Sequence, residues 1–318
     1  MTERVAALIL QLVKTSRIPP DALHIFSVGR GTDPLSDQML HNWLDALTNI
    51  GSFAASETAL TLAAMSMHSG RKLTASKIQN IITQPALFAA EGTRKKADVM
   101  LTHHWLELSK KLVTLDTSAE VTVLRVLIDS IAGGSSTTYS LGSEGERFLD
   151  QLVARRPMEA WRIVSDYVNP PMDIRGFVLT RWLRGDRGFG ERSPGPMRHF
   201  PREAVWSWVE PDPEARASYI ASMAPKDFSP ETWKGSLIRE TLCRFGDSDR
   251  VQSAVSANFF TGSWGGPTST HYTEQMEALR KLKVEETNPN ALRWLNNMLV
   301  SLERNIEEAQ IEEEARGY

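Results

Sequence analysis

The chain has 318 residues, of which 41% are hydrophobic, 24% charged and 8% aromatic, as is ordinary for a globular protein with a full core. Its 36 basic and 39 acidic residues give a net charge of −3, so the chain as a whole shows no bias toward nucleic acid or anionic membranes. One cysteine, Cys243, excludes an internal disulfide framework and a cysteine-rich zinc module. The longest apolar run, Val5–Val13, is too short to span a membrane and lacks a cleavage site, so we expect a cytoplasmic protein.

Apolar residues recur at the spacing of an α-helix along most of the chain. Clear stripes of this kind lie in four segments, Leu35–Ile50, Ala97–Leu112, Val121–Ile131 and Leu292–Ala309. No two strand-like runs are joined by Asn-Gly or Asp-Gly, and no strand–helix–strand rhythm occurs. The pattern therefore predicts an all-α protein of about fifteen helices joined by short turns.

Helix starts are marked by a capping side chain followed by proline. This pair occurs at Asp33–Pro34, Asp212–Pro213, Ser229–Pro230 and Asn288–Pro289. The side-chain oxygen caps free backbone N–H groups, and proline at the first helical position gives up an N–H that has no partner there. Asp116, before Thr117 and Ser118, is expected to cap the helix that carries the Val121–Ile131 stripe.

A weak internal repeat favours stacked helix pairs. Pro157–Trp161 resembles Pro201–Trp206, with the two prolines 44 residues apart, and Pro230–Trp233 is a fainter copy. A period near 44 residues is typical of two-helix repeats, and the chain resembles a degenerate repeat of the HEAT and armadillo kind. We expect an α-solenoid of stacked antiparallel helix pairs, with a compact multi-helix bundle as the alternative.

Two segments interrupt the helical pattern. The glycine- and serine-rich loop 133–145 divides the chain into an N-terminal helical region, 1–132, and a C-terminal helical-repeat region, 146–318, which alternatively pack as one continuous array. The second interruption, Gly185–Pro201, is rich in glycine and proline. Long irregular excursions of this kind are either binding elements or disordered.

No pattern nominates a catalytic residue, a metal site or a cofactor. The histidines are scattered, and neighbours such as His103 and His104 point about 100° apart on a helix, so they cannot converge on one metal. His104 falls on an apolar stripe and is expected to be a core histidine. Cys243 lies in a helical pattern and is expected to be packed rather than reactive.

The sharpest candidate for binding is an arginine-rich segment with interleaved aromatic residues. Seven arginines lie within 28 residues, against only Asp186 and Glu191. Guanidinium and aromatic groups suit phosphate contact and base stacking, so the segment is a candidate site for nucleic acid, nucleotide or an acidic protein. The alternative is a solvated face, or pairing with the glutamate-rich C-terminal helix. The candidate residues are Arg175, Arg181, Trp182, Arg184, Arg187, Arg192, Arg198 and Arg202.

A glycine-rich loop before a helix is the second candidate. It lacks the Gly-Lys-Ser/Thr ending of a phosphate-binding loop, so a tight turn packed by aromatic side chains is the favoured interpretation. The stretch Phe260–Tyr272 resembles segments in the C-terminal helical regions of large bacterial multidomain proteins, some linked to phage defence, over about the last 70 residues. The resemblance carries no catalytic residue. The candidate residues are Gly262, Trp264, Gly265, Gly266, His271 and Tyr272.

The N-terminal helix, expected over residues 3–14, presents an apolar face formed by Val5, Leu8, Ile9, Leu12 and Val13. Such a face needs cover from a subunit interface or a longer assembly, which predicts a protein partner here and on the repeat surface. Taken together, the sequence predicts a non-catalytic scaffold, sensor or regulatory subunit of a bacterial multi-component system, with antiviral defence as one setting. Nucleic-acid binding through residues 175–202 is the alternative, and a hydrolase or nucleotide enzyme is the second alternative.

Overall fold

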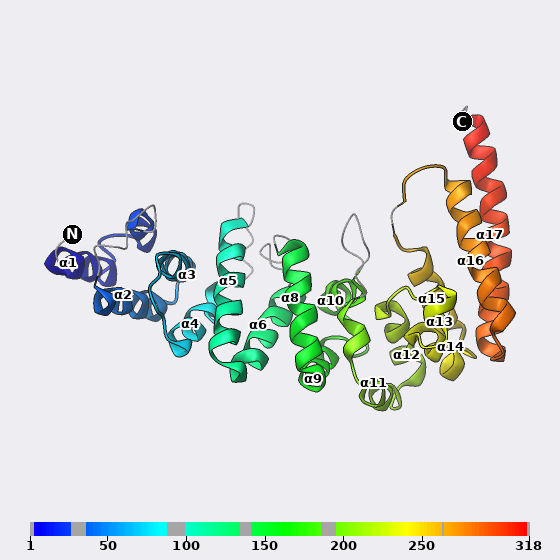
Figure 1. The fold of residues 1–318 in the computed structure, drawn as a ribbon, viewed down its shortest axis with the longest axis horizontal. Helices are drawn as coiled ribbons and strands as arrows, with labels where there is room; N and C mark the ends of the chain where they lie inside the picture. Colours follow the sequence, from blue (N-terminus) through cyan, green and yellow to red (C-terminus); the bar gives the residue numbers. More distant parts are fainter. Residues whose placement is uncertain are drawn as a thin grey trace. The chain divides into compact units, whose positions relative to one another are not determined.

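The computed structural model describes residues 3–26, 36–87, 99–133, 141–185, 195–262 and 264–316 (Figure 1). Every regular element in these ranges is helical, which confirms the predicted all-α class. No helix in the same ranges combines the length and apolar composition that a membrane crossing requires. The chain divides into two compact units, Met1–Ala160 and Trp161–Tyr318, which are called unit 1 and unit 2 below.

Unit 1 is built from short helices that pack mainly on their neighbours in the chain. α3 packs against α2, η1 and α5, while α4 packs against α5 and α6 against α8. The predicted boundary loop 133–145 lies within this unit, and residues 134–140 of it fall outside the described ranges. Its elements are α1 (Glu3–Lys14), η1 (Pro20–Phe26), α2 (Asp37–Ile50), α3 (Phe53–His68), α4 (Ala75–Ile82), η2 (Pro85–Leu87), α5 (Val99–Leu115), η3 (Thr117–Ala119), α6 (Glu120–Ala132) and α8 (Gly142–Arg155), with α9 (Pro157–Tyr167) spanning the point of division.

The first helix buries only part of the apolar face that the sequence predicts. α1 turns Ala6, Leu10 and Val13 into the core, and the Ala6 carbonyl accepts a hydrogen bond from the Trp43 indole at 3.2 Å. By contrast, Val5 is 46% exposed and Leu8 is 59% exposed. The predicted apolar face is therefore partly a core face, and Val5 and Leu8 form its exposed part.

Unit 2 contains the remaining helices, and each contacts helices that come before or after it. α12 packs against α10 and α11, and against the later α14 and α15; α14 packs in turn against α17. α16 and α17 make the most extensive contact and run side by side in Figure 1. The elements are α10 (Ile174–Arg184), η4 (Pro196–His199), α11 (Arg202–Val209), α12 (Pro213–Met223), α13 (Pro230–Trp233), α14 (Leu237–Phe245), α15 (Asp249–Phe260), α16 (Thr268–Glu285) and α17 (Pro289–Ala315).

Most of the predicted helix starts are present. The Asn288 side chain accepts hydrogen bonds from two backbone N–H groups at the start of α17, and the Asp212 side chain accepts one, from Ala215, at the start of α12. Asp116 caps η3, which leads directly into α6. Ser229 precedes α13, although its side chain makes no capping bond. Asp33–Pro34 lies outside the described residues, and α2 begins at Asp37 after the cap Ser36.

Candidate functional site

The arginine-rich segment is distributed over three helical elements of unit 2. Arg175, Arg181, Trp182 and Arg184 lie on α10, Arg198 lies in η4, and Arg202 begins α11. Arg187 and Arg192 lie outside the described residues. At 100° per residue, Arg181 and Arg184 share a face of α10 that does not include Arg175. The arginines therefore do not form a single helical stripe.

Trp182 belongs to the core of unit 2. Its side chain is 2% exposed, beside the buried Leu179 and Leu183 on the same face of α10. Phe200, which follows η4, is also buried and contacts Trp161 with ring centroids 5.1 Å apart. These two aromatic rings hold the arginine-bearing elements to the core, so the expectation that Trp182 interleaves with the arginines as part of a stacking surface is not met.

A cavity of about 370 Å³ opens where α15 ends and α16 begins. Three of the predicted loop residues, Gly262, Trp264 and His271, line it. The loop beside the cavity contains two glycines with positive φ, +148° at Gly262 and +96° at Gly266. Residues with an L side chain rarely adopt these backbone angles. Its other polar and aromatic lining includes Lys226, Asp227, Phe228, Phe260, Thr261 and Gln275.

Trp264 and His271 form the aromatic wall of this cavity. Their rings lie 4.4 Å apart and within 9° of parallel, and Tyr272 flanks Trp264 at 5.9 Å. Tyr272 also meets Phe260 edge to face, with a centroid distance of 6.4 Å. The loop is therefore packed by aromatic side chains, as the sequence indicated, yet Trp264 remains 41% exposed.

The arginine-rich segment and the glycine-rich loop meet at this cavity. Arg184 Nη1 donates to Thr261 Oγ1 at 3.3 Å, across 77 residues of sequence. Gly262 follows Thr261 directly, and a Cβ atom added to Gly262 would lie 3.3 Å from Lys226 Nζ. Two cationic side chains thus approach two successive residues of the loop, which the sequence alone could not show.

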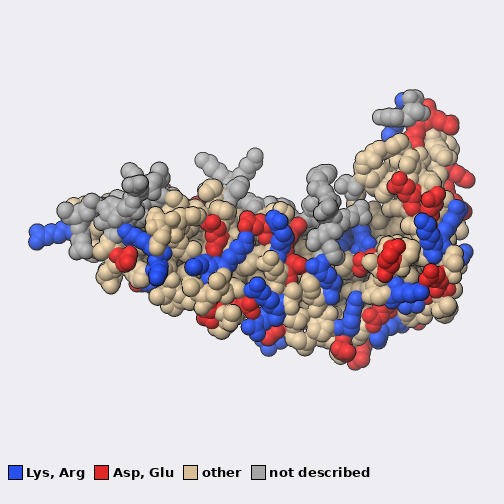
Figure 2. All heavy atoms as spheres, in the orientation of Figure 1, with Lys and Arg blue, Asp and Glu red and all other residues tan. Residues whose placement is uncertain are grey.

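Arg198 and Arg202 are two further cations near Asp227, the acidic residue that lines the cavity. Burial raises the pKa of Asp227, and the charges of Arg202 and Arg198 oppose that rise. Burial lowers the pKa of Arg202, against the attraction of Glu240 and Asp227. We call the cavity with Arg184, Arg198, Arg202, Lys226 and Asp227 the basic pocket. Over the visible face in Figure 2, basic and acidic side chains are intermixed.

Stacked aromatic rings lie beneath the basic pocket. Phe228, which lines the cavity, stacks on Trp233 with ring centroids 6.2 Å apart and on Trp294 at 5.6 Å. Phe259 meets Phe228 edge to face at 5.0 Å. Large rings packed in this way dominate the energetics of a core, so the pocket rests on a rigid base.

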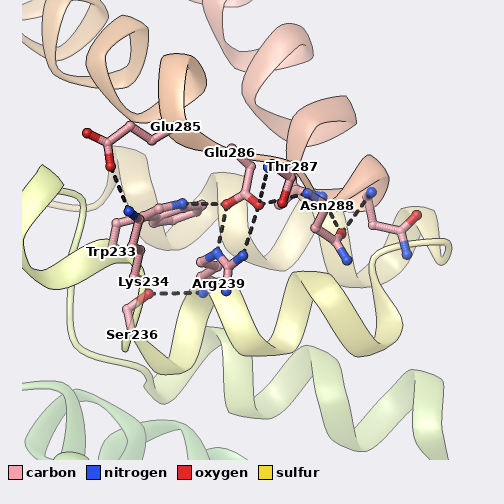
Figure 3. Close-up of polar contacts among 10 residues, drawn as sticks. Trp233, Lys234, Ser236, Arg239, Glu285, Glu286, Thr287 and Asn288 are labelled. Atoms are coloured by element: carbon pink, nitrogen blue, oxygen red, sulfur yellow. Dashed lines mark hydrogen bonds and ion pairs between the residues drawn. The ribbon is translucent and has the colours of Figure 1, made fainter.

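One buried carboxylate fixes this aromatic base (Figure 3). Glu286, whose side chain is fully buried, accepts hydrogen bonds from the Trp233 indole at 2.7 Å and from Arg239 Nε and Nη2 at 2.7 and 3.0 Å. The backbone N–H groups of Thr287 and Asn288 donate to it at 2.9 Å each. Burial acts to raise the pKa of Glu286, but these donors outweigh it and hold that pKa at about 2.

The pKa of Glu286 predicts how the stability of unit 2 depends on pH. The unfolded chain binds this proton near pH 4.5, whereas the folded chain resists it until about pH 2. The contribution is therefore complete above pH 5 and is lost as the pH falls from about 4.5 toward 2, by about 3 kcal/mol. In urea titrations at several pH values, the stability difference between the wild type and Glu286→Gln should shrink across that range. A pH-independent difference would contradict the prediction.

The other residues considered for chemistry are placed as packed groups. His104 is 4% exposed on α5, and burial raises the pKa of the half-buried Cys243 thiol, which disfavours the thiolate. Within the described ranges no group of histidine, cysteine and acidic side chains could hold a metal ion. Three glutamates of α17 contact α16 or the end of their own helix: Glu303 pairs with Arg280, Glu313 accepts from Ser269, and Glu312 pairs with Arg316.

Sequence reasoning missed Lys226, Asp227, Thr261 and Gln275. Gln275 carried a usable signal, because it follows His271 by four residues and so shares its face of α16. Lys226 and Asp227 follow α12 in an irregular segment, and only the tertiary fold brings them to the loop.

Compared with known proteins, the chain matches no family model, no curated protein and no solved structure.

Proposed function

We propose that the protein is a helical-repeat scaffold or regulatory subunit that recognises an anionic partner at the basic pocket. The observation that carries the proposal is the bond from Arg184 to Thr261, which unites the two candidate segments around one cavity. Among the described residues, Arg184, Lys226, Arg198 and Arg202 lie around one acid of the cavity, Asp227, and Glu240 pairs with Arg202 at 3.9 Å, so basic side chains outnumber acidic ones in a chain of net charge −3. A concave site of one sign concentrates ligands of the opposite sign.

The contacts between helices support a solenoid of stacked pairs in unit 2. α12 lies between α10 and the later α14 and α15, and α14 leads on to α17. The Trp161 indole donates to the Ala204 carbonyl at 3.2 Å, 43 residues along the chain, close to the 44-residue repeat. This contact joins the first two segments of the proposed repeat. Proteins of this architecture act through broad recognition surfaces, which is an argument by analogy of fold.

Charge reversal in the basic pocket tests the proposal. Any anionic partner that co-purifies with the tagged full chain should be recovered in at least fivefold lower amount with the double variant Arg184→Glu, Lys226→Glu than with the wild type. The reason is that the variant reverses two positive charges at the cavity. The matched control is Arg250→Glu, Arg304→Glu, which changes two exposed arginines elsewhere in unit 2 and should retain wild-type amounts. Quantitative mass spectrometry of the eluates measures the effect. Equal partner recovery from both double variants would refute the proposal.

Single-stranded nucleic acid is the second candidate, favoured by the exposed Arg181 beside Arg184 on one face of α10. Affinity for an oligonucleotide should fall steeply with salt. Arg181→Glu with Arg184→Glu should weaken binding and flatten its dependence on log [salt], by roughly 0.7 for each phosphate that the variant no longer neutralises. Fluorescence anisotropy with a labelled oligonucleotide measures both quantities. Absence of binding at low salt would exclude this candidate.

A further inference from the structure

We infer that the cavity of the basic pocket is a nucleotide site, which takes a purine base against Trp264 and the attached phosphate between Lys226 and Arg184. The inference rests on the proposed function and names the chemistry of the anion. The shared chemistry is that of a nucleoside monophosphate, either free or at the end of a single strand. The cavity volume of about 370 Å³ lies within the range of small-molecule sites.

The aromatic wall supplies the surface for the base. Trp264 is stacked on His271 at 4.4 Å, nearly parallel, so its ring plane is fixed before any ligand arrives. Because Trp264 is 41% exposed and lines the cavity, a planar ring can extend the stack. Stacking of this kind tolerates different bases and is strongest on large aromatic side chains.

An acceptor inside the cavity favours a base that carries an amino group. Gln275 Oε1 is buried and has no hydrogen-bond partner among the described residues. A buried carbonyl oxygen without a donor costs free energy, which a ligand N–H would recover. The exocyclic amino group of adenine is such a donor, on the edge of a ring that Trp264 would stack.

Two cations define where the phosphate lies. Arg184 reaches Thr261 at 3.3 Å, and Lys226 Nζ lies against Gly262, which has no side chain to hold it away. A guanidinium and an ammonium group beside two successive loop residues, Thr261 and Gly262, suit a phosphate that contacts the loop. Asp227 is the one acid that lines the cavity among the described residues, and the charges of Arg202 and Arg198 act on it. The repulsion that it would exert on a phosphate is therefore opposed.

Isothermal titration of the full chain tests the inference with four probes: adenosine monophosphate, adenosine, inorganic phosphate, and purine riboside monophosphate, which lacks the amino group. Adenosine monophosphate should bind at least tenfold more tightly than each of the other three. Trp264→Ala and Lys226→Met should each weaken it about tenfold or more. Phe177→Ala and Lys283→Met, both exposed and away from the cavity, should leave it unchanged. In Gln275→Met the preference for the amino group should disappear.

Two further probes separate the outcomes. An adenine-containing single strand that binds more tightly than the mononucleotide identifies a strand end as the source, and equal or weaker binding identifies the free nucleotide. A glutamate-rich peptide that binds at the pocket while nucleotides do not would overturn this inference and leave the proposed function standing. Wild-type affinity for the nucleotide in Trp264→Ala would also overturn it. Failure of every anionic probe to bind would refute both.

Discussion

Replacing Glu286 by glutamine is expected to lower the free energy of unfolding of unit 2 by about 3 kcal/mol at pH 7. The carboxylate is fully buried and accepts five hydrogen bonds, two of them from Arg239. Removing one partner of a buried ion pair leaves the other charge uncompensated, which costs far more than the pair itself contributes. Glutamine keeps the volume but turns an amide N–H₂ toward a cluster of donors.

The adjacent Glu285 provides a matched control. Glu285 pairs with Lys234 at 2.8 Å, but both side chains are more than 60% exposed. Surface pairs of this kind contribute little, so Glu285→Gln should change stability by less than about 0.5 kcal/mol. Urea titration followed by tryptophan fluorescence measures both variants, and hydrogen exchange in α14 and the start of α17 assigns the destabilisation to unit 2. Similar destabilisation in both variants would contradict the role given to Glu286.

The sequence was sufficient for the secondary structure because helix signals are local. Caps such as Asn288 and Asp212 act on N–H groups two or three residues away, so their effect can be read without the tertiary fold. For Trp182, which the sequence analysis assigned to the binding segment, the same periodicity carried a signal that was not used. Leu179, Trp182 and Leu183 share one face of α10, a spacing that indicates burial rather than an exposed binding surface.

The candidate site could be predicted only in part. Both segments around the cavity stand out in the sequence, one by its arginines and the other by Trp264 and its glycines. Their meeting depends on the contact between Arg184 and Thr261, 77 residues apart, which no local pattern encodes. Lys226 has no distinguishing neighbour in sequence, and only the fold brings its Nζ close to Gly262.

Glu286 shows a different limit of sequence reasoning. Between Glu285 and Thr287 it looks like one more solvated charge at a helix end, yet the structure buries it beneath the pocket. Its partner Trp233 lies 53 residues earlier and continues through Phe228 to the cavity. The hydrogen-bonded cluster around Glu286 and the basic pocket are thus joined by contact. A substitution that disrupts the cluster should therefore also destabilise the pocket.

Gly195→Ala is expected to destabilise unit 2 by about 3 kcal/mol and to disturb the basic pocket at the same time. Gly195 sits on the end of α10, where its N–H donates to the Arg184 carbonyl at 3.2 Å. A Cβ there would lie 2.1 Å from the Leu183 carbonyl oxygen and 2.4 Å from the Arg184 carbonyl carbon. Because these are backbone atoms, no side chain can swing aside, and η4 or the end of α10 must move.

The consequence reaches the site because Gly195 holds η4, with Arg198, against the helix that carries Arg184. Displacing either element should break the bond from Arg184 to Thr261 and weaken the binding of anions along with stability. Gly235→Ala is the control: a Cβ there meets nothing within 4 Å, so that variant should be unchanged or up to about 1 kcal/mol more stable. Thermal unfolding and anion titration of both variants measure the two effects. Wild-type stability in Gly195→Ala would show that the end of α10 and η4 are not held together as described.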